Sequence, residues 1–155
     1  KDSPLTPMQM AQELAAQKAL SIKADYENSY ILGADQLIEF SGEIIGKAGS
    51  SDKATEQLLR MSGRSHKLIT SMCLITPQKT FEHTEMAMMH MRSLKKEQAH
   101  KYVLQNETWN CAGSYKIECQ PALIFEKVIT EDPTSILGLA TFKLVTWLKE
   151  LQYIQ

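Results

Sequence analysis

Hydrophobic residues recur along the chain with two periods, and stretches of the two kinds alternate. Stretches in which apolar residues return every three to four positions predict helices, and short apolar runs between turn residues predict buried strands. The predicted helices cover residues 7–23, 51–62, 93–103 and 133–151, and the predicted strands cover 29–34, 37–40, 44–45, 66–76, 80–92 and 122–129. Because helices and strands interleave, the predicted fold class is α/β with a mixed sheet.

Local signals support these bounds. Thr6 and Pro7 supply a helix N-cap followed by a proline at the first helical position. The turn Ser41-Gly42 separates two short strands and predicts a hairpin. No internal repeat or linker interrupts the pattern, so we expect a single domain over residues 1–155.

The composition is that of an ordinary globular domain, and it argues against several classes of partner. Of the 155 residues, 43% are hydrophobic and 23% are charged, which is enough to build a core without disulfides. The net charge of −1 offers no broad basic face, so we expect no nucleic acid polymer and no membrane as partner. No apolar stretch approaches the roughly 20 residues of a membrane span.

The cysteines and histidines show no metal-site spacing. Cys73, Cys111 and Cys119 are odd in number and form no CxxC pair, which is typical of reduced thiols in a cytoplasmic protein. The four histidines lack the spacing of zinc ligands, and no HExxH motif occurs. A nucleophilic role for Cys111 is not favoured, because no histidine stands near it in the sequence.

A carboxylate and an ammonium stand at the two ends of the predicted hairpin. Asp35 follows Gly33 just beyond the end of a predicted strand, where open α/β sheets usually bind ligands. A carboxylate there can coordinate Mg²⁺ or act as a general base toward water. Lys47 follows Gly46 and can bind a phosphate as a point charge. Spacing alone favours plainer roles, a turn cap for Asp35 and a solvated turn residue for Lys47.

The segment CAGSYKIE (111–118) is a second candidate for ligand binding. Its small residues at 112–114 permit a ligand to approach the backbone. If residues 115–118 are extended, Lys116 and Glu118 share one polar face. The alternative is an exposed edge strand with a salt bridge.

The loop Ser62-Gly63-Arg64 stands where the predicted helix at 51–62 ends. Its backbone amides and the Arg64 guanidinium can hold an anion. Such loops are more often only the C-cap of a helix.

Taken in order, six segments resemble the Maf family of nucleoside triphosphate pyrophosphatases. They are LAAQKA around Lys18, LGADQ (32–36), GEIIGK (42–47), MSGRSH (61–66), CAGSYKIE (111–118) and DPTSILGL (132–139). Each is weak alone, but together they span nearly the whole chain. The dTTP/UTP-cleaving branch reads GADT and KAGAYxIQG, whereas this chain reads GADQ and CAGSYKIE, which resembles the branch that cleaves 7-methyl-GTP.

The resemblance implies a fold and an activity. The fold would be α/β and related to that of ITPases, with an elongated mixed sheet flanked by helices and two lobes around a nucleotide cleft. The activity would be hydrolysis between the α- and β-phosphates to a nucleoside monophosphate and pyrophosphate, dependent on a divalent cation, Mg or Mn. Family members are frequently homodimers.

The resemblance also assigns roles to individual residues. Asp35 matches the catalytic carboxylate, the proton acceptor for the attacking water, and is also the candidate metal ligand. Lys47 matches a lysine that neutralises phosphate charge. Gln36 and Glu118 match the positions that distinguish the base specificity of the two branches. A carboxylate at Glu118 can accept hydrogen bonds from guanine N1–H and its amine, and it attracts the fixed charge of 7-methylguanine. The candidate phosphate or nucleotide contacts are Lys18, Ser62 and Arg64.

The chain departs from the family pattern in three places. The family begins with a strand and an SxSxxR loop that grips the triphosphate, followed by an acidic metal-binding segment, and neither is present before the helix that carries Lys18. Ala48 replaces the usual proline after Lys47, and Cys119-Gln120-Pro121 replaces a glycine-rich continuation. We therefore expect either an omitted upstream region or an impaired homologue. The alternatives to a 7-methyl-GTP pyrophosphatase are the same chemistry on dTTP or UTP, and a nucleotide-binding or septum-related protein that has lost catalysis.

Overall fold

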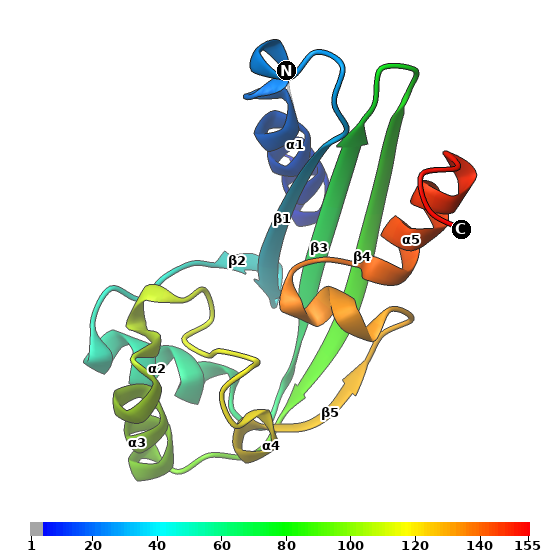
Figure 1. Ribbon diagram of the computed structural model, residues 1–155. Helices are drawn as coiled ribbons and strands as arrows, with labels where there is room; N and C mark the ends of the chain where they lie inside the picture. Colours follow the sequence, from blue (N-terminus) through cyan, green and yellow to red (C-terminus); the bar gives the residue numbers. More distant parts are fainter. Residues whose placement is uncertain (1–4) are drawn as a thin grey trace. The chain divides into compact units, whose positions relative to one another are not determined.

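The computed structural model describes residues 5–155 as an α/β protein (Figure 1). The helices are α1 (Pro7–Leu20), α2 (Ser51–Met61), α3 (Lys96–Asn106), α4 (Pro121–Ile124) and α5 (Thr141–Glu150), and the strands are β1 (Ile31–Phe40), β2 (Glu43–Ile45), β3 (Ser65–Ile75), β4 (Thr80–Met91) and β5 (Phe125–Ile129). Three short 3₁₀ segments are η1 (Lys23–Asp25), η2 (Thr108–Asn110) and η3 (Pro133–Leu137). The predicted fold class is confirmed.

The strands form one sheet in the order β2-β1-β3-β4-β5. The predicted hairpin is confirmed, with Phe40 of β1 opposite Glu43 of β2. Neighbouring strands of this sheet run antiparallel (Figure 1), so the prediction of a mixed sheet is wrong. A helix between two strands often connects parallel neighbours, which is why the interleaved pattern predicted a mixed sheet. Here α2 joins β2 to β3, which lie on either side of β1 and are not neighbours.

β1 is one continuous strand of 10 residues, which corrects the prediction of a strand that ends at Gly33. Asp35 therefore lies inside a strand and not beyond its end. Gly33 has a packing role, because an added Cβ would lie 2.2 Å from the Ala15 carbonyl oxygen and 2.6 Å from the Ala19 nitrogen. The glycine allows α1 to pack directly on the strand.

The chain divides into two compact units. Unit 1 takes in the described residues up to Gln36 together with Ile69–Met86 and Thr130–Gln155, and unit 2 takes in Leu37–Leu68 and Ala87–Ile129. β1, β3 and β4 each contribute residues to both units. The predictions of one domain and of a cleft between two lobes stay predictions.

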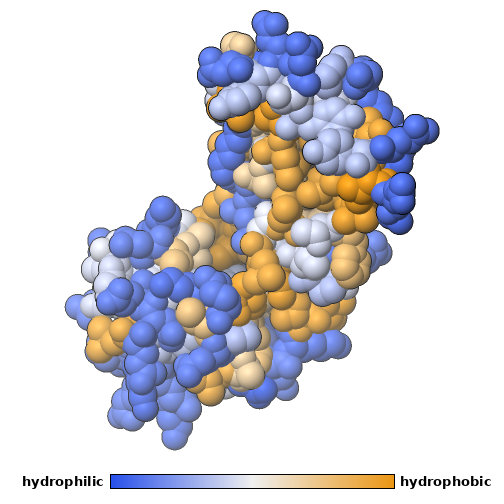
Figure 2. Space-filling view, in the orientation of Figure 1, coloured by the Kyte–Doolittle hydropathy of each residue, from blue (hydrophilic) through white to orange (hydrophobic). Residues whose placement is uncertain are grey.

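In unit 1, β3 is buried on both faces. One apolar cluster contains Ala15, Ala19, Ile31, Cys73 and Ile75, and the other contains Met72, Leu74, Ala140 and Trp147. Because side chains alternate along a strand, α1 covers one face of β3 and α5 covers the other. Apolar residues at the surface of this unit gather on the segment of η3 and α5 (Figure 2), where Leu137 and Phe142 are 68% and 59% exposed.

Two predicted elements near the end of the chain are divided in the structure. The predicted strand at 122–129 begins with the single helical turn α4, and only its second half is β5. The predicted helix at 133–151 consists of η3 and α5, because Gly138 adopts a φ of +100° and ends the first turn. A left-handed glycine is a common way to stop a helix.

Candidate active site

The predicted site residues fall into two groups, one in each compact unit. Unit 1 contains Lys18, Asp35 and Gln36, and unit 2 contains Lys47, Ser62, Arg64 and Glu118. Each group has its own set of contacts.

In unit 1, Lys18 and Asp35 form an ion pair. The Lys18 Nζ donates to Asp35 Oδ1 at 2.6 Å and to the Ala34 carbonyl oxygen at 3.0 Å. The Asp35 side chain is only 13% exposed, whereas that of Lys18 is 56% exposed. The last turn of α1 thus brings an ammonium to a largely buried carboxylate on β1. Such pairing offsets the cost of removing the carboxylate from water.

The second carboxylate oxygen of Asp35 is buried and has no hydrogen-bond partner among the described residues. Buried polar atoms are almost always paired, so an unpaired one indicates a place for water, an ion or a ligand. Residues 5–155 hold no cluster of three or more His, Cys, Asp or Glu side chains suited to a metal. The unpaired oxygen of Asp35 would suit a cation such as Mg²⁺, which takes one or two protein carboxylates and otherwise binds water and substrate phosphates, and metal binding stays a prediction.

Gln36 lies on the opposite face of β1 from Asp35, because successive strand residues alternate. Its Nε2 donates to Thr70 Oγ1 at 2.8 Å and to the Ser135 carbonyl oxygen at 3.0 Å. Thr70 Oγ1 in turn donates to the Ser135 carbonyl oxygen at 3.0 Å. The structure therefore places the two adjacent candidates Asp35 and Gln36 in different surroundings.

In unit 2, the structure brings together two predicted segments that are far apart in the sequence. Lys47 forms an isolated antiparallel bridge with Ala112, and the Gly113 N–H donates to the Gly46 carbonyl oxygen at 3.4 Å. The Lys47 side chain is exposed. The glycine of GEIIGK thus lies against the small residues of CAGSYKIE, of which Gly113 and Ser114 are buried.

Gln57 of α2 connects the same two segments, and sequence reasoning missed it. Its Nε2 donates to the Gly46 carbonyl oxygen at 3.2 Å, and its Oε1 accepts a hydrogen bond from Ser114 Oγ at 2.5 Å. A glutamine in an amphipathic helix carries no signal of such a role, because its pattern is that of a solvated face.

The extended conformation considered for residues 115–118 is not present, since Ile117 and Glu118 lie in a turn and none of the four residues belongs to a strand. Gly113 and Ser114 both have positive φ, and the Cys119 N–H donates to the Lys116 carbonyl oxygen at 3.0 Å. The Lys116 ammonium donates to the Asn106 carbonyl oxygen at 2.8 Å and does not share a polar face with Glu118. The side chain of Glu118 is exposed.

Tyr115 is buried and not ligand-facing. Its hydroxyl lies 2.9 Å from His66 Nε2, and both residues are nearly inaccessible to solvent. Burial, with a smaller contribution from His90, lowers the pKa of His66 to about 4. His66 is therefore neutral at physiological pH, and its role is in the core of unit 2.

The side chains of the Ser62-Gly63-Arg64 loop contact neighbouring parts of unit 2. Ser62 Oγ accepts a hydrogen bond from the Leu94 N–H at 2.6 Å, as in a structural helix end. Arg64 donates to Ser41 Oγ at 3.1 Å, and its guanidinium lies over the Phe40 ring at 4.5 Å from the centroid. Arg64 remains exposed, so its guanidinium is accessible to an anion.

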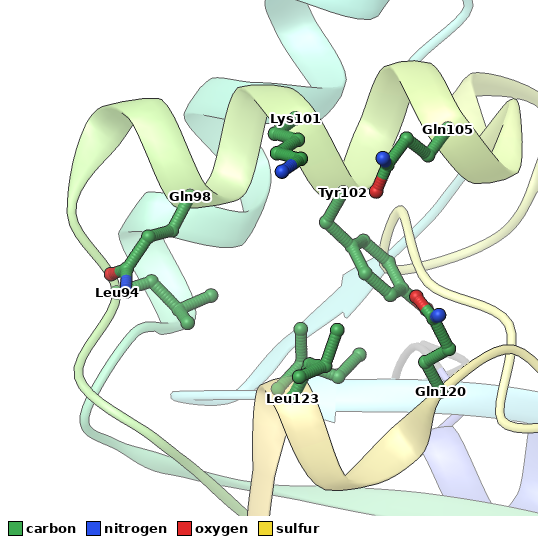
Figure 3. Close-up of a pocket in the computed structure, with 8 residues that line it drawn as sticks. Leu94, Gln98, Lys101, Tyr102, Gln105, Gln120 and Leu123 are labelled. Carbon is green, nitrogen blue, oxygen red and sulfur yellow. The ribbon is translucent and has the colours of Figure 1, made fainter.

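Unit 2 also contains a cavity of about 370 Å³ between α3 and α4 (Figure 3). It is lined by Leu94, Gln98, Lys101, Tyr102, Gln105, Gln120, Leu123 and Ile124, none of which is a predicted site residue. Figure 3 shows the Tyr102 ring reaching from α3 toward Gln120. The Tyr102 hydroxyl lies 3.1 Å from the carbonyl oxygens of both Lys116 and Cys119. Tyr102 thus holds the turn that carries Glu118.

A second cavity of about 570 Å³ lies between α2 and α3. Its lining includes the carboxylates of Asp52, Glu56 and Glu97. Lys96 and His100 also line it, but three carboxylates against one lysine leave an excess of negative charge, which repels a triphosphate.

Two further observations concern the cysteines and the length of the helices. The three cysteines are free thiols. Of the helices in the described chain, none has both the length and the apolar character needed to cross a membrane.

Comparisons with known proteins give a consistent result. A family model described as Maf-like protein matches residues 1–151. The 7-methyl-GTP pyrophosphatase of Bdellovibrio bacteriovorus is 40% identical over 144 residues, which are 93% of this chain and 75% of the relative. The enzyme of the same name from Colwellia psychrerythraea is 33% identical over 147 residues, 94% of this chain and 74% of the relative. The dTTP/UTP pyrophosphatase of Aquifex aeolicus is 33% identical over 151 residues, 97% of this chain and 79% of the relative.

Proposed function

The chain belongs to the Maf family of nucleotide pyrophosphatases, and from this membership we propose that it hydrolyses 7-methyl-GTP or a related modified nucleotide. The products are the nucleoside monophosphate and pyrophosphate. The resemblance read from the motifs is confirmed at the level of the family and of its hydrolase activity. The substrate is our proposal.

The Lys18–Asp35 pair is the observation that carries the chemical part of the proposal. Asp35 Oδ1 is held by the ammonium, and Oδ2, which is buried without a hydrogen-bond partner among the described residues, is our candidate for the atom that accepts a proton from the attacking water. The water oxygen forms a bond to the α-phosphorus, and the bond from that phosphorus to the oxygen bridging the α- and β-phosphates breaks. Pyrophosphate leaves with this bridging oxygen.

Hydrolysis of a triphosphate builds up negative charge in the transition state, which cationic side chains stabilise. Lys47 is exposed at the surface built by its bridge to Ala112 and is our candidate phosphate contact. Arg64 and Ser62 are the further candidates in unit 2. As the alternative to its role as proton acceptor, Asp35 would hold a divalent cation, Mg²⁺ or Mn²⁺, together with the substrate phosphates, and the cation would supply charge neutralisation.

Base preference is assigned to Glu118 and Gln36. The exposed Glu118 carboxylate can accept two hydrogen bonds from the guanine edge, and it attracts the positive charge of the methylated base. The names of the relatives from Bdellovibrio and Colwellia support this substrate. The Aquifex relative supports the second candidate, the same chemistry on dTTP or UTP.

The test is pyrophosphate release by the full-length protein from 7-methyl-GTP, GTP, dTTP and UTP, each with Mg²⁺ or Mn²⁺. We expect the highest kcat/KM with 7-methyl-GTP. A higher value with dTTP or UTP would select the second candidate, and nucleotide binding without turnover would select the impaired homologue. The homodimer and the cytoplasmic location stay predictions, which sedimentation and cell fractionation can test.

A further inference from the structure

A row of hydrogen-bonding side chains crosses three neighbouring strands of unit 1. Gln36 is on β1, Thr70 is on β3 and Glu85 is on β4, and these strands are adjacent in the sheet. Thr70 is 1% exposed and Glu85 is 7% exposed. All three residues contact the stretch 130–136, which includes most of η3 and which we call the 130–136 segment.

The orientation of the Gln36 amide is determined by its surroundings. The carbonyl oxygens of Ser135 and Ile136, at 3.0 and 3.5 Å, can only accept hydrogen bonds. The Thr70 hydroxyl donates its one proton to the Ser135 carbonyl oxygen and therefore accepts from Gln36. The atom that faces these three oxygens must be Nε2, so both of its protons are used within the protein.

Glu85 holds the other end of the 130–136 segment. One of its oxygens accepts hydrogen bonds from Thr130 Oγ1 at 2.8 Å, from the Glu131 N–H at 3.0 Å and from the Asp132 N–H at 3.3 Å. Asp132 then accepts hydrogen bonds from Thr134 and from the first turn of α5. The segment is thus attached to β4 near its start, and to β3 and β1 near Ser135.

The attachment to β1 is next to the proposed catalytic carboxylate. Asp35 faces α1, where Lys18 holds it, and Gln36 faces the 130–136 segment. We propose that Gln36 and Thr70 are positioning residues that hold the 130–136 segment on β1, and that Gln36 acts on base preference through this segment. The part of this inference that concerns base preference rests on the proposed function. The part that concerns the attachment of the 130–136 segment to β1 does not.

The geometry is tested without substrate by hydrogen exchange of backbone amides in the full-length protein. The Gly138 N–H donates to the Ser135 carbonyl oxygen at 2.9 Å and reports on this region. The substitutions Gln36→Leu and Thr70→Val should each increase the exchange rate of the Gly138 amide about tenfold. Thr70→Ser keeps the hydroxyl and should leave this rate as in the wild type. Unchanged exchange in Gln36→Leu would overturn the inference.

Ser71→Ala is the matched control. Ser71 is as buried as Thr70 and precedes Met72 on the same strand, but its hydroxyl bonds to Thr84 on the opposite face at 2.9 Å. This variant loses a comparable hydrogen bond and should leave the Gly138 amide unchanged. Faster exchange in Ser71→Ala as well would show a general loosening of the fold and would overturn the inference.

Base preference supplies the second measurement, the ratio of kcat/KM for 7-methyl-GTP to that for dTTP. Thr70→Val should change this ratio in the same direction as Gln36→Leu, and the double variant should be no worse than the single ones, because both break one network. A ratio that changes in Gln36→Leu but not in Thr70→Val would mean that Gln36 contacts the base itself. If the wild type turns over no nucleotide, the proposed function fails, and the exchange data still decide the positioning role.

Discussion

Lys18 and Asp35 are 17 residues apart in the sequence, and the lysine Nζ lies 2.6 Å from one oxygen of the aspartate. The other oxygen is buried and unpaired within the described part of the chain. One carboxylate therefore has an oxygen held by an ammonium and a buried oxygen whose accepting capacity the described residues do not use. This asymmetry suits a group that accepts a proton from a bound water.

Asp35→Asn should lower kcat of the full-length protein by about 10²–10⁴, because an amide oxygen is a poor proton acceptor. The amide can still accept a hydrogen bond from Lys18, so the fold should persist. Pyrophosphate release and thermal unfolding measure the two effects. Full activity in a folded Asp35→Asn protein would contradict the proposed role.

Lys18→Met should also lower kcat, because Asp35 loses the partner that orients it. Because the Asp35 side chain is only 13% exposed, losing its partner should also lower stability, so kcat is compared for protein that thermal unfolding shows to be folded. Lys79→Met is the control, since it removes a different ion pair of unit 1, the one between Lys79 and Glu150. Equal effects of the two substitutions on kcat would show that Lys18 has no special role.

Glu118→Gln should reduce the preference for 7-methyl-GTP over dTTP by about tenfold, because an amide does not attract the charged base as a carboxylate does. The measurement is the ratio of kcat/KM values for the two substrates. Glu126→Gln, at an exposed position of β5, is the control. If both variants keep the wild-type ratio, Glu118 does not read the base.

His66 should make stability depend on pH between about 6.5 and 4. Its pKa is about 4 in the folded protein, below the ordinary value of 6.5, because it is buried. The unfolded chain therefore binds a proton first as the pH falls, and stability decreases from pH 6.5 to pH 4 by on the order of 3 kcal/mol. Urea unfolding at a series of pH values measures this change.

The control for this experiment is His66→Gln, which keeps a hydrogen-bonding group near Tyr115. The pKa of Glu85 and that of Asp132 would be raised by burial, but hydrogen bonds lower both below the ordinary value. Because their pKa values are lowered in the folded protein, protonation of these carboxylates also reduces stability as the pH falls, equally in the wild type and in the His66→Gln variant. The difference in unfolding free energy between wild type and variant therefore reports on His66 alone. If this difference does not vary with pH, the lowered pKa of His66 is refuted.

Gly33→Ala should destabilise the protein by about 1–3 kcal/mol, because the new methyl group would overlap the backbone of α1. It should also lower activity, since α1 carries Lys18. Gly46→Ala is the control, because an added Cβ there meets no atom within 4 Å. Equal melting temperatures for the two variants would contradict the close packing of α1 on β1.

Local signals were sufficient for the elements whose bounds depend on a few adjacent residues. Thr6 accepts a hydrogen bond from the Gln9 N–H in a capping box at the start of α1, and the Ser41-Gly42 turn joins β1 to β2. The same signals failed at Gly33, whose absent side chain makes room for a helix and does not turn the chain. The sequence shows how a residue affects its own backbone conformation. It does not show that a glycine is needed because a helix distant in the sequence packs against it.

The sequence by itself determined the α/β class, the bounds of α2, β2, β3 and β4 to within a residue, and the ordered motifs that led to the Maf family. Only the tertiary structure decided which side chains meet. It paired Lys18 with Asp35, attached Gln36 to Thr70, and joined the segments of Lys47 and Ala112. The physical reason is that backbone propensity depends on neighbours along the chain, whereas a hydrogen bond between distant residues depends on how the elements pack.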